Sequence, residues 1–180
     1  PEDLSGSSGF DNSANTLFIQ PLLMERYLSA ADLAVARALP SEAKTELEKR
    51  ARRKVLVAEP GAEKSDAEAA AEILARFLPR AYRRPVDSME LEETRALFSK
   101  FRGKGDDFLT AIRKTLAAIL VSPKFLLRLE DSKERDGPYD VGEYEMANRL
   151  SYFLWASMPD SQLFDLAREG RLRDPEVIEK

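Results

Sequence analysis

Hydrophobic side chains recur every three to four residues along most of this chain, which is the spacing of helices with one buried face. Proline, glycine and short polar stretches interrupt that pattern. No segment has a convincing strand pattern, so we predict an all-α fold of about seven or eight helices in a bundle-like array with short loops. The predicted helices cover residues 21–39, 41–56, 65–78, 87–102, 106–121, 140–157 and 160–169, with a short apolar turn or helix at 125–129 and a further helix from 175.

The predicted helices carry recognisable start and stop signals. Proline at position 21 is well tolerated in a first helical turn. Pro79 should kink its helix or end it near Leu78. Three pairs of residues have the spacing of a capping box, in which two side chains satisfy the first backbone N–H groups of a helix. These pairs are Ser65 with Glu68, Asp87 with Glu90, and Asp140 with Glu143.

The composition excludes several classes of chemistry within these 180 residues. The chain contains neither cysteine nor histidine, which removes disulfides, thiolate zinc sites, C-x-x-C-H haem attachment and histidine-dependent triads. Its net charge of −4 argues against nucleic acid as a partner. No run approaches the ~18–20 apolar residues of a membrane span. With 43% hydrophobic residues, the chain can still build a sizeable core.

The segment 149–160, RLSYFLWASMPD, holds the single tryptophan, Trp155, beside Tyr152 and Phe153. These aromatics could stack on a sugar or on the edge of a haem. Aromatics beside leucines at helical spacing belong more often to a core, so we expect a helix buried almost all round. A core position predicts that Trp155→Ala destabilises the fold by ~3–5 kcal/mol.

Two groups of polar residues are candidate binding sites. Oxygen ligands from Asp11, Asn12 and Asn15 could bind calcium, although a single carboxylate is few for such a site and the same residues shape turns. The arginines at positions 80, 83 and 84 could bind an anion or a sugar, since guanidinium groups suit carboxylates and phosphates. Their structural alternative is to pair with carboxylates or to cap the C-termini of helices.

Other charged groups favour structural interpretations. The basic run at 49–54 predicts a solvated helical face, because it lacks the interleaved aromatics of a nucleic-acid surface. Glu143 and Glu145 point apart on a helix and do not form a glycosidase-like carboxylate pair. We predict no catalytic constellation, metal site or bound cofactor in these residues.

Three segments in succession resemble known families. GFDNSANTLFIQPLLMERYL, at 9–28, resembles the end of DUF1587. AAEILARFLPRAYRRPV, at 70–86, and FLTAIRKTLAAILVSPKFLLRLE, at 108–130, resemble DUF1595. YEMANRLSYFLWASMPDSQLFDLAREGRLRDPEV, at 144–177, resembles the start of DUF1592. The order is that of large multidomain proteins abundant in Planctomycetes.

The resemblance implies a context rather than a reaction. It divides the chain into a DUF1587-like part (1–60), a DUF1595-like helical module (61–132) and the start of a DUF1592-like module (138–180). Such parent proteins are usually exported, and many carry cytochrome c-like modules with haem c or carbohydrate-binding modules. We therefore expect a helical scaffold, a fragment of an exported multidomain protein, whose partners are neighbouring domains of the parent. The alternatives are part of a redox or polysaccharide-processing enzyme, or a protein–protein interaction module, which would show an exposed apolar patch.

Overall fold

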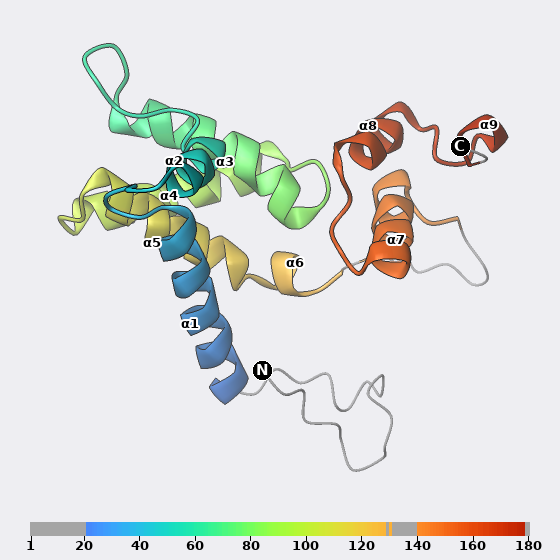
Figure 1. Cartoon of the computed structure of the whole chain (residues 1–180), viewed down its shortest axis with the longest axis horizontal. Coiled ribbons are helices and arrows are strands. Elements are labelled where there is room, and N and C mark those ends of the chain that lie inside the picture. The colour runs from blue at the N-terminus through green and yellow to red at the C-terminus, as the bar shows by residue number, and fades with distance from the viewer. Residues whose placement is uncertain (1–20, 129, 131–139, 179–180) are drawn as a thin grey trace.

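The computed structural model describes residues 21–128, 130 and 140–178 of the chain. All regular secondary structure in these residues is helical, and they contain no strand (Figure 1). The predicted all-α class is therefore confirmed. The larger group of helices has α5 at its centre, since α5 contacts α1, α3 and α4. Its helices are α1 (Pro21–Ala38), α2 (Glu46–Val55), α3 (Asp66–Tyr82), α4 (Ser88–Gly103), α5 (Phe108–Leu120) and the single turn α6 (Pro123–Leu126).

The C-terminal helices form a second, smaller group. They are α7 (Glu143–Trp155), α8 (Ser161–Glu169) and α9 (Pro175–Ile178), and α7 packs against α8. This group lies to one side of α1–α6 (Figure 1). No helix in the described ranges has both the length and the apolar composition that crossing a membrane requires.

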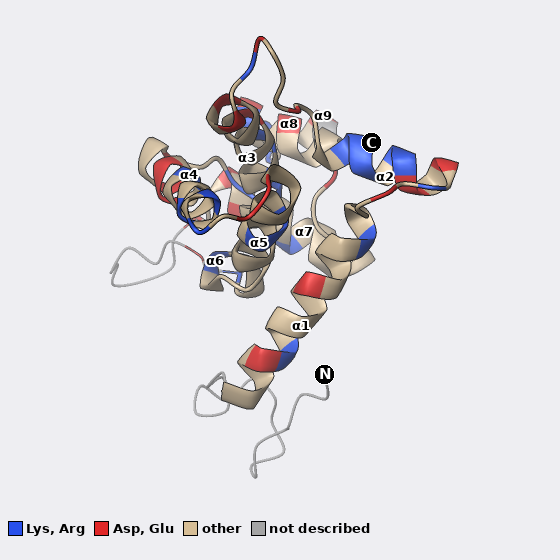
Figure 2. Cartoon of the chain, turned by 90° about the vertical axis from the view of Figure 1, so that its left-hand side faces the viewer, with Lys and Arg blue, Asp and Glu red and all other residues tan. Residues whose placement is uncertain are grey.

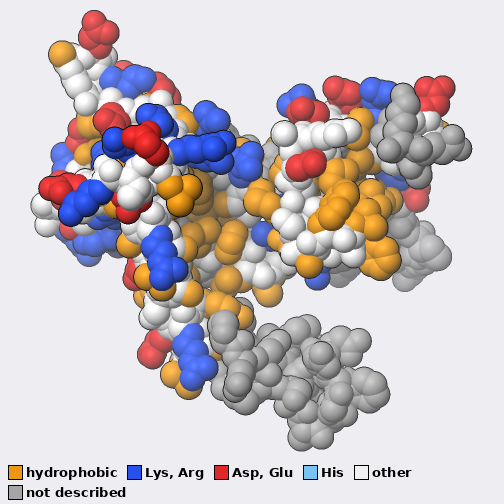
Figure 3. Space-filling model, viewed as in Figure 1, with side chains coloured by type: hydrophobic (Ala, Val, Ile, Leu, Met, Phe, Trp, Pro, Cys, Tyr) orange, Lys and Arg blue, Asp and Glu red, His pale blue; other side chains and the backbone are white. Residues whose placement is uncertain are grey.

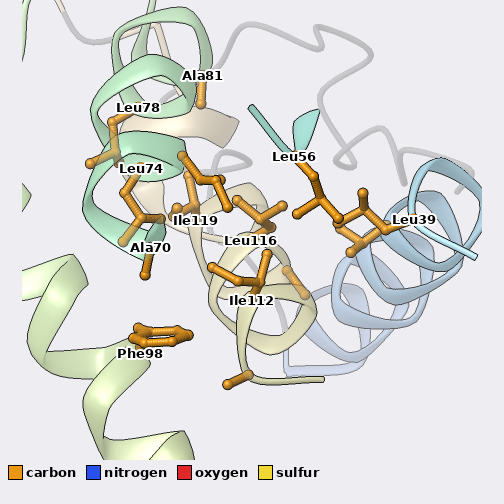
Figure 4. Close-up of a cluster of buried hydrophobic side chains, with 14 of the residues drawn as sticks. Leu39, Leu56, Ala70, Leu74, Leu78, Ala81, Phe98, Ile112, Leu116 and Ile119 are labelled. Carbon is orange, nitrogen blue, oxygen red and sulfur yellow. The ribbon is translucent and has the colours of Figure 1, made fainter. Parts of the chain in front are cut away.

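The main core forms where α3, α4 and α5 meet. Figure 4 shows Leu74 of α3 and Phe98 of α4 beside Ile112 and Leu116 of α5. Leu39, which follows α1, closes the cluster from the other side. Arg113 connects α5 to the end of α1, because its Nε donates a hydrogen bond of 2.7 Å to the Leu39 carbonyl. The core thus joins the helices on both sides of the proposed boundary at residue 60.

The start signals of α3 and α4 are confirmed. The Ser65 hydroxyl accepts a hydrogen bond from the Glu68 N–H, and the Asp87 carboxylate accepts one from the Glu90 N–H. Helix α2 starts later than predicted, at Glu46, because Thr45 and Glu48 form a further capping box that the sequence interpretation missed.

The predicted capping box of Asp140 and Glu143 is wrong. Helix α7 begins at Glu143 with Gly142 as its N-cap, and the Glu145 carboxylate accepts a 2.6 Å hydrogen bond from the Gly142 N–H. The carboxylate of Glu143 is engaged elsewhere: it accepts hydrogen bonds from the Leu172 N–H and from Arg173. It therefore ties the chain after α8 to the start of α7.

Pro79 does not end α3 near Leu78, which was one of its two predicted effects; the other, a kink in the helix, stays a prediction. The helix continues through Pro79 to Tyr82. Proline removes one backbone hydrogen bond from an interior turn. In α3 the missing backbone hydrogen bond lies close to the end of the helix. The Pro79 carbonyl still accepts hydrogen bonds from the N–H groups of Arg83 and Arg84. Leu78 and Ala81, on either side of the proline, belong to the buried core, which favours the continued helix.

Candidate functional site

The turn that follows α3 holds two of the three predicted arginines in structural roles. Arg83 ends the helix in the left-handed region, with φ of 57°. Its side chain is buried, and its Nη2 donates hydrogen bonds to the carbonyls of Phe125 (2.9 Å) and Leu127 (3.0 Å). These carbonyls end α6, so Arg83 caps the C-terminus of that turn. This contact joins two segments more than 40 residues apart.

Arg84 forms an ion pair with Glu90, which lies in the first turn of α4. Both guanidinium Nη atoms bind the carboxylate, at 2.9 and 2.7 Å, and Lys124 of α6 adds a third contact at 2.7 Å. The hydrogen bond from Arg84, followed by that from Lys124, lowers the pKa of Glu90 from 4.5 to about 2, although burial opposes the shift. Glu90 is therefore an anion that holds α3, α4 and α6 together.

Arg80 differs from the other two arginines because its side chain is exposed at a cleft. The cleft has a volume of about 720 Å³ and lies between the α2–α3 region and the end of α7. Arg76, one turn earlier on α3, and Lys54 of α2 line the same cleft. In Figure 2, basic residues are concentrated on α2.

Sequence reasoning missed Arg76 and Lys54 as neighbours of Arg80. The signal was present in the spacing, because residues 73, 76, 77, 80 and 81 share one face of a helix. The interpretation grouped Arg80 with Arg83 and Arg84 by their closeness in sequence. The helix ends between them, so Arg80 is exposed at the cleft, whereas the guanidinium of Arg83 is held by carbonyls of α6 at its edge.

A few polar contacts connect the two groups of helices. The Asn148 amide donates a 3.4 Å hydrogen bond to the Arg83 carbonyl, and the Arg128 guanidinium lies 4.7 Å from the centre of the Tyr152 ring. Arg149 binds both carboxylate oxygens of Glu130 at 2.7 and 2.6 Å. Both groups contribute to the cleft, whose far wall contains Tyr152 and Met158.

The prediction that Trp155 and Phe153 lie in the core is wrong. Trp155 is 62% exposed and Phe153 is 86% exposed. Helix α7 buries its smaller residues instead: Ala147 and Ser151, one turn apart, lie on the buried side. The Ser151 hydroxyl donates a 2.7 Å hydrogen bond to the Ser157 carbonyl, which holds the chain where it leaves the helix. One helix in a two-helix contact buries one face, so a continuous apolar run must leave part of itself in solvent.

We name the exposed residues Phe153, Leu154 and Trp155 the α7 apolar face. Leu154 is 57% exposed. The space-filling view shows hydrophobic side chains gathered over α7 (Figure 3). Large apolar side chains that are exposed close together are typical of a surface that another macromolecule covers.

Replacing Trp155 by alanine should cost the isolated chain less than about 1 kcal/mol of unfolding free energy, in place of the larger loss expected for a core residue. Most of the indole surface is already in water, so little burial is lost. Denaturant unfolding followed by circular dichroism measures the difference. A loss above about 3 kcal/mol would show that the indole is buried.

The remaining candidates do not assemble into a site. Asp11, Asn12 and Asn15 lie outside the described residues, so the calcium hypothesis stays a prediction. Within the described ranges, no group of three or more acidic or metal-binding side chains could hold a metal ion. In the basic run, Lys49 pairs with Glu46 and Arg52 with Glu59.

Three protein-family profiles match the chain in succession. They are PSD3, protein of unknown function (DUF1587), at residues 1–40; PSD5, protein of unknown function (DUF1595), at 69–130; and PSD4, protein of unknown function (DUF1592), at 141–180. Neither a curated protein nor a solved structure matches the chain. The matches fall on the segments whose resemblance to DUF1587, DUF1595 and DUF1592 the sequence indicates, and none of the three family descriptions assigns a reaction.

Proposed function

Because the chain joins segments of three families of unknown function, DUF1587, DUF1595 and DUF1592, we propose that it is a helical scaffold that positions neighbouring modules of one larger protein. The observation that carries this proposal is the α7 apolar face. An interaction module would show such a surface as well, and the two functions differ in whether the partner belongs to the same polypeptide. Three consecutive large apolar side chains are exposed in the last turn of α7, one turn beyond the buried Ala147 and Ser151. Their transfer out of water would favour docking.

The occupant of the α7 apolar face is an adjoining module of the same polypeptide. Modules linked in one chain meet at a high effective concentration, so a small apolar contact is enough to hold them together. The α7 apolar face lies in the DUF1592 segment, whereas the core of α3–α5 lies mainly in the DUF1595 segment. The α3–α5 core would provide the rigid part of the scaffold, and the α7 apolar face would bind the adjoining module.

The wider setting of the proposal follows the family resemblance. The parent would be an exported protein, and the docked module would be cytochrome c-like or carbohydrate-binding. Any haem c would be attached to that module, because these 180 residues contain neither cysteine nor histidine.

The single tryptophan allows a direct test of docking. We would label Trp155 with 5-fluorotryptophan and record its ¹⁹F resonance while adding the separately produced adjoining modules of the parent. Docking should shift the resonance and protect it from a soluble paramagnetic quencher. Phe153→Ser, which keeps the label, should weaken this association at least about tenfold.

Leu33→Ser is the matched control, because Leu33 is an exposed leucine of α1 far from the α7 apolar face in sequence. It should leave the association within about twofold. A resonance that the adjoining modules do not move contradicts the proposal. A shift that depends only on the concentration of the chain itself would assign the face to a second copy, and would contradict it too.

A further inference from the structure

The cleft between the two groups of helices combines an apolar surface with basic groups. Phe77 of α3, Leu120 of α5 and Phe125 of α6 contribute apolar walls, and Met158 closes the side formed by the chain after α7. In the space-filling view, basic side chains border a hollow lined by hydrophobic ones (Figure 3). The volume of about 720 Å³ falls in the range of small-molecule sites, ~300–1,000 Å³.

Three of the four basic residues that line this cleft have no partner among the described residues. Among the described residues, Lys54, Arg76 and Arg80 make no hydrogen bond, ion pair or cation–π contact. The described lining also contains no carboxylate. By contrast, the neighbouring Arg52 pairs with Glu59, and Lys64 pairs with Glu72. The chain has enough acidic residues to neutralise its surface, with 32 against 28 basic ones, yet leaves this cleft positive.

The arrangement has an electrostatic cost. Arg76 and Arg80 lie four residues apart on one helix face, where like charges repel. The buried Arg83 adds a further positive charge to the lining, and the hydrogen bonds from its guanidinium go to carbonyl oxygens rather than to a carboxylate. A cleft with apolar walls strengthens the field of such charges, because water screens them less well. An anion would relieve the repulsion.

We infer that this cleft is a binding site for a small amphipathic anion, a molecule with an acidic head group and an apolar body. The head group would bind the guanidinium groups of Arg76 and Arg80, which suit carboxylates and sulfonates geometrically. The body would lie against Phe77, Leu120 and Phe125. The inference is independent of the docking proposal, since the α7 apolar face is formed by other residues than this lining.

The test compares decanoate with decylammonium, which has the same chain length and the opposite charge. Isothermal titration of the 180-residue chain, below the micelle concentration of either probe, should show one decanoate bound and no decylammonium. The double variant Arg76→Gln, Arg80→Gln should weaken decanoate at least about tenfold. Raising the salt concentration should weaken it as well, because partly exposed charges are screened.

The matched control is the double variant Arg37→Gln, Arg53→Gln. It changes the net charge by the same amount, and both side chains are exposed and absent from the lining. It should leave decanoate affinity within about twofold. Equal binding of the two probes, or equal loss in both double variants, would overturn the inference. So would the absence of decanoate binding when an acidic peptide binds, because the site would then serve a protein.

A second readout places the ligand. Methyl-labelled methionine gives one resonance for each of the four methionines. Decanoate should shift the resonance of Met158, which lines the cleft, and leave that of the exposed Met89 on α4 in place. A shift confined to the ¹⁹F label on Trp155 would instead locate the probe on the α7 apolar face and overturn the assignment to the cleft.

Discussion

Replacing Leu116 by alanine should lower the free energy of unfolding by ~2–5 kcal/mol, the largest stability effect that we expect from a single substitution in this chain. Leu116 is 1% exposed and lies on α5, the helix that contacts α1, α3 and α4. Its side chain lies among Ile112, Ile119 and Leu56 in the close-up of the core (Figure 4). Alanine would leave a cavity that the neighbouring helices cannot fully close, because a packed core relaxes only in part.

The control for this substitution is Leu47→Ala, the same chemical change at a position of α2 that is 78% exposed. It should change the unfolding free energy by less than about 0.5 kcal/mol, since no packed contact is lost and alanine favours the helix. Urea titrations followed by far-ultraviolet circular dichroism measure both variants. Similar losses for the two leucines would contradict the central position of α5.

The helices of this chain could be predicted because their signals are local. Ser65 with Glu68 and Asp87 with Glu90 lie within one turn of each other, so the capping geometry follows from the sequence alone. The same rule failed at Asp140, where a more distant partner decided the outcome: Glu143 binds Arg173 and the Leu172 N–H. A local pattern does not contain that contact.

The segment 149–160 shows why burial is harder to predict than helicity. Hydrophobic content indicated a core, yet the small residues Ala147 and Ser151 make the packed face, because they let α7 approach its neighbours closely. Phe153 lies on another side of α7, whereas Trp155, four residues after Ser151, lies on the packed side but at the exposed end of the helix. Which face of an apolar helix is buried depends on the neighbours available, and single-sequence periodicity does not name them.

The three arginines at positions 80, 83 and 84 have different roles because α3 ends between Arg80 and Arg83, although their side chains are chemically identical. Arg80 is the last basic residue within α3, and Arg83 adopts the left-handed conformation that ends the helix. The three arginines of the candidate site therefore differ in their contacts. Arg80 is exposed at the cleft, Arg83 binds the end of α6 beside the cleft, and Arg84 binds the start of α4. Residue type indicated possible anion binding, but only the backbone path decides which arginine keeps its guanidinium accessible.

The ion pairs of Glu90 connect stability to pH. Hydrogen bonds from Arg84 and Lys124 lower the pKa of Glu90 to about 2. A carboxylate with a lowered pKa stabilises the fold fully above the pKa of the unfolded chain, near 4.5, and this contribution is lost as the pH falls toward the folded value. The full shift corresponds to on the order of 3 kcal/mol, and solvent around the half-exposed Arg84 and Lys124 reduces it to about 2 kcal/mol.

The variant Glu90→Gln should therefore be less stable than the parent chain by about 2 kcal/mol at neutral pH, and by less than half of that at about pH 2.5. The double difference isolates Glu90, because the other carboxylates titrate in both proteins. Glu92→Gln is the control on the same helix: Glu92 makes an exposed pair with Arg95, so its replacement should cost under about 0.5 kcal/mol at either pH. Urea unfolding at the two pH values provides the measurement. A Glu90→Gln deficit that stays constant between them would show that the carboxylate acts through shape and hydrogen bonding to Asp87 rather than through its charge.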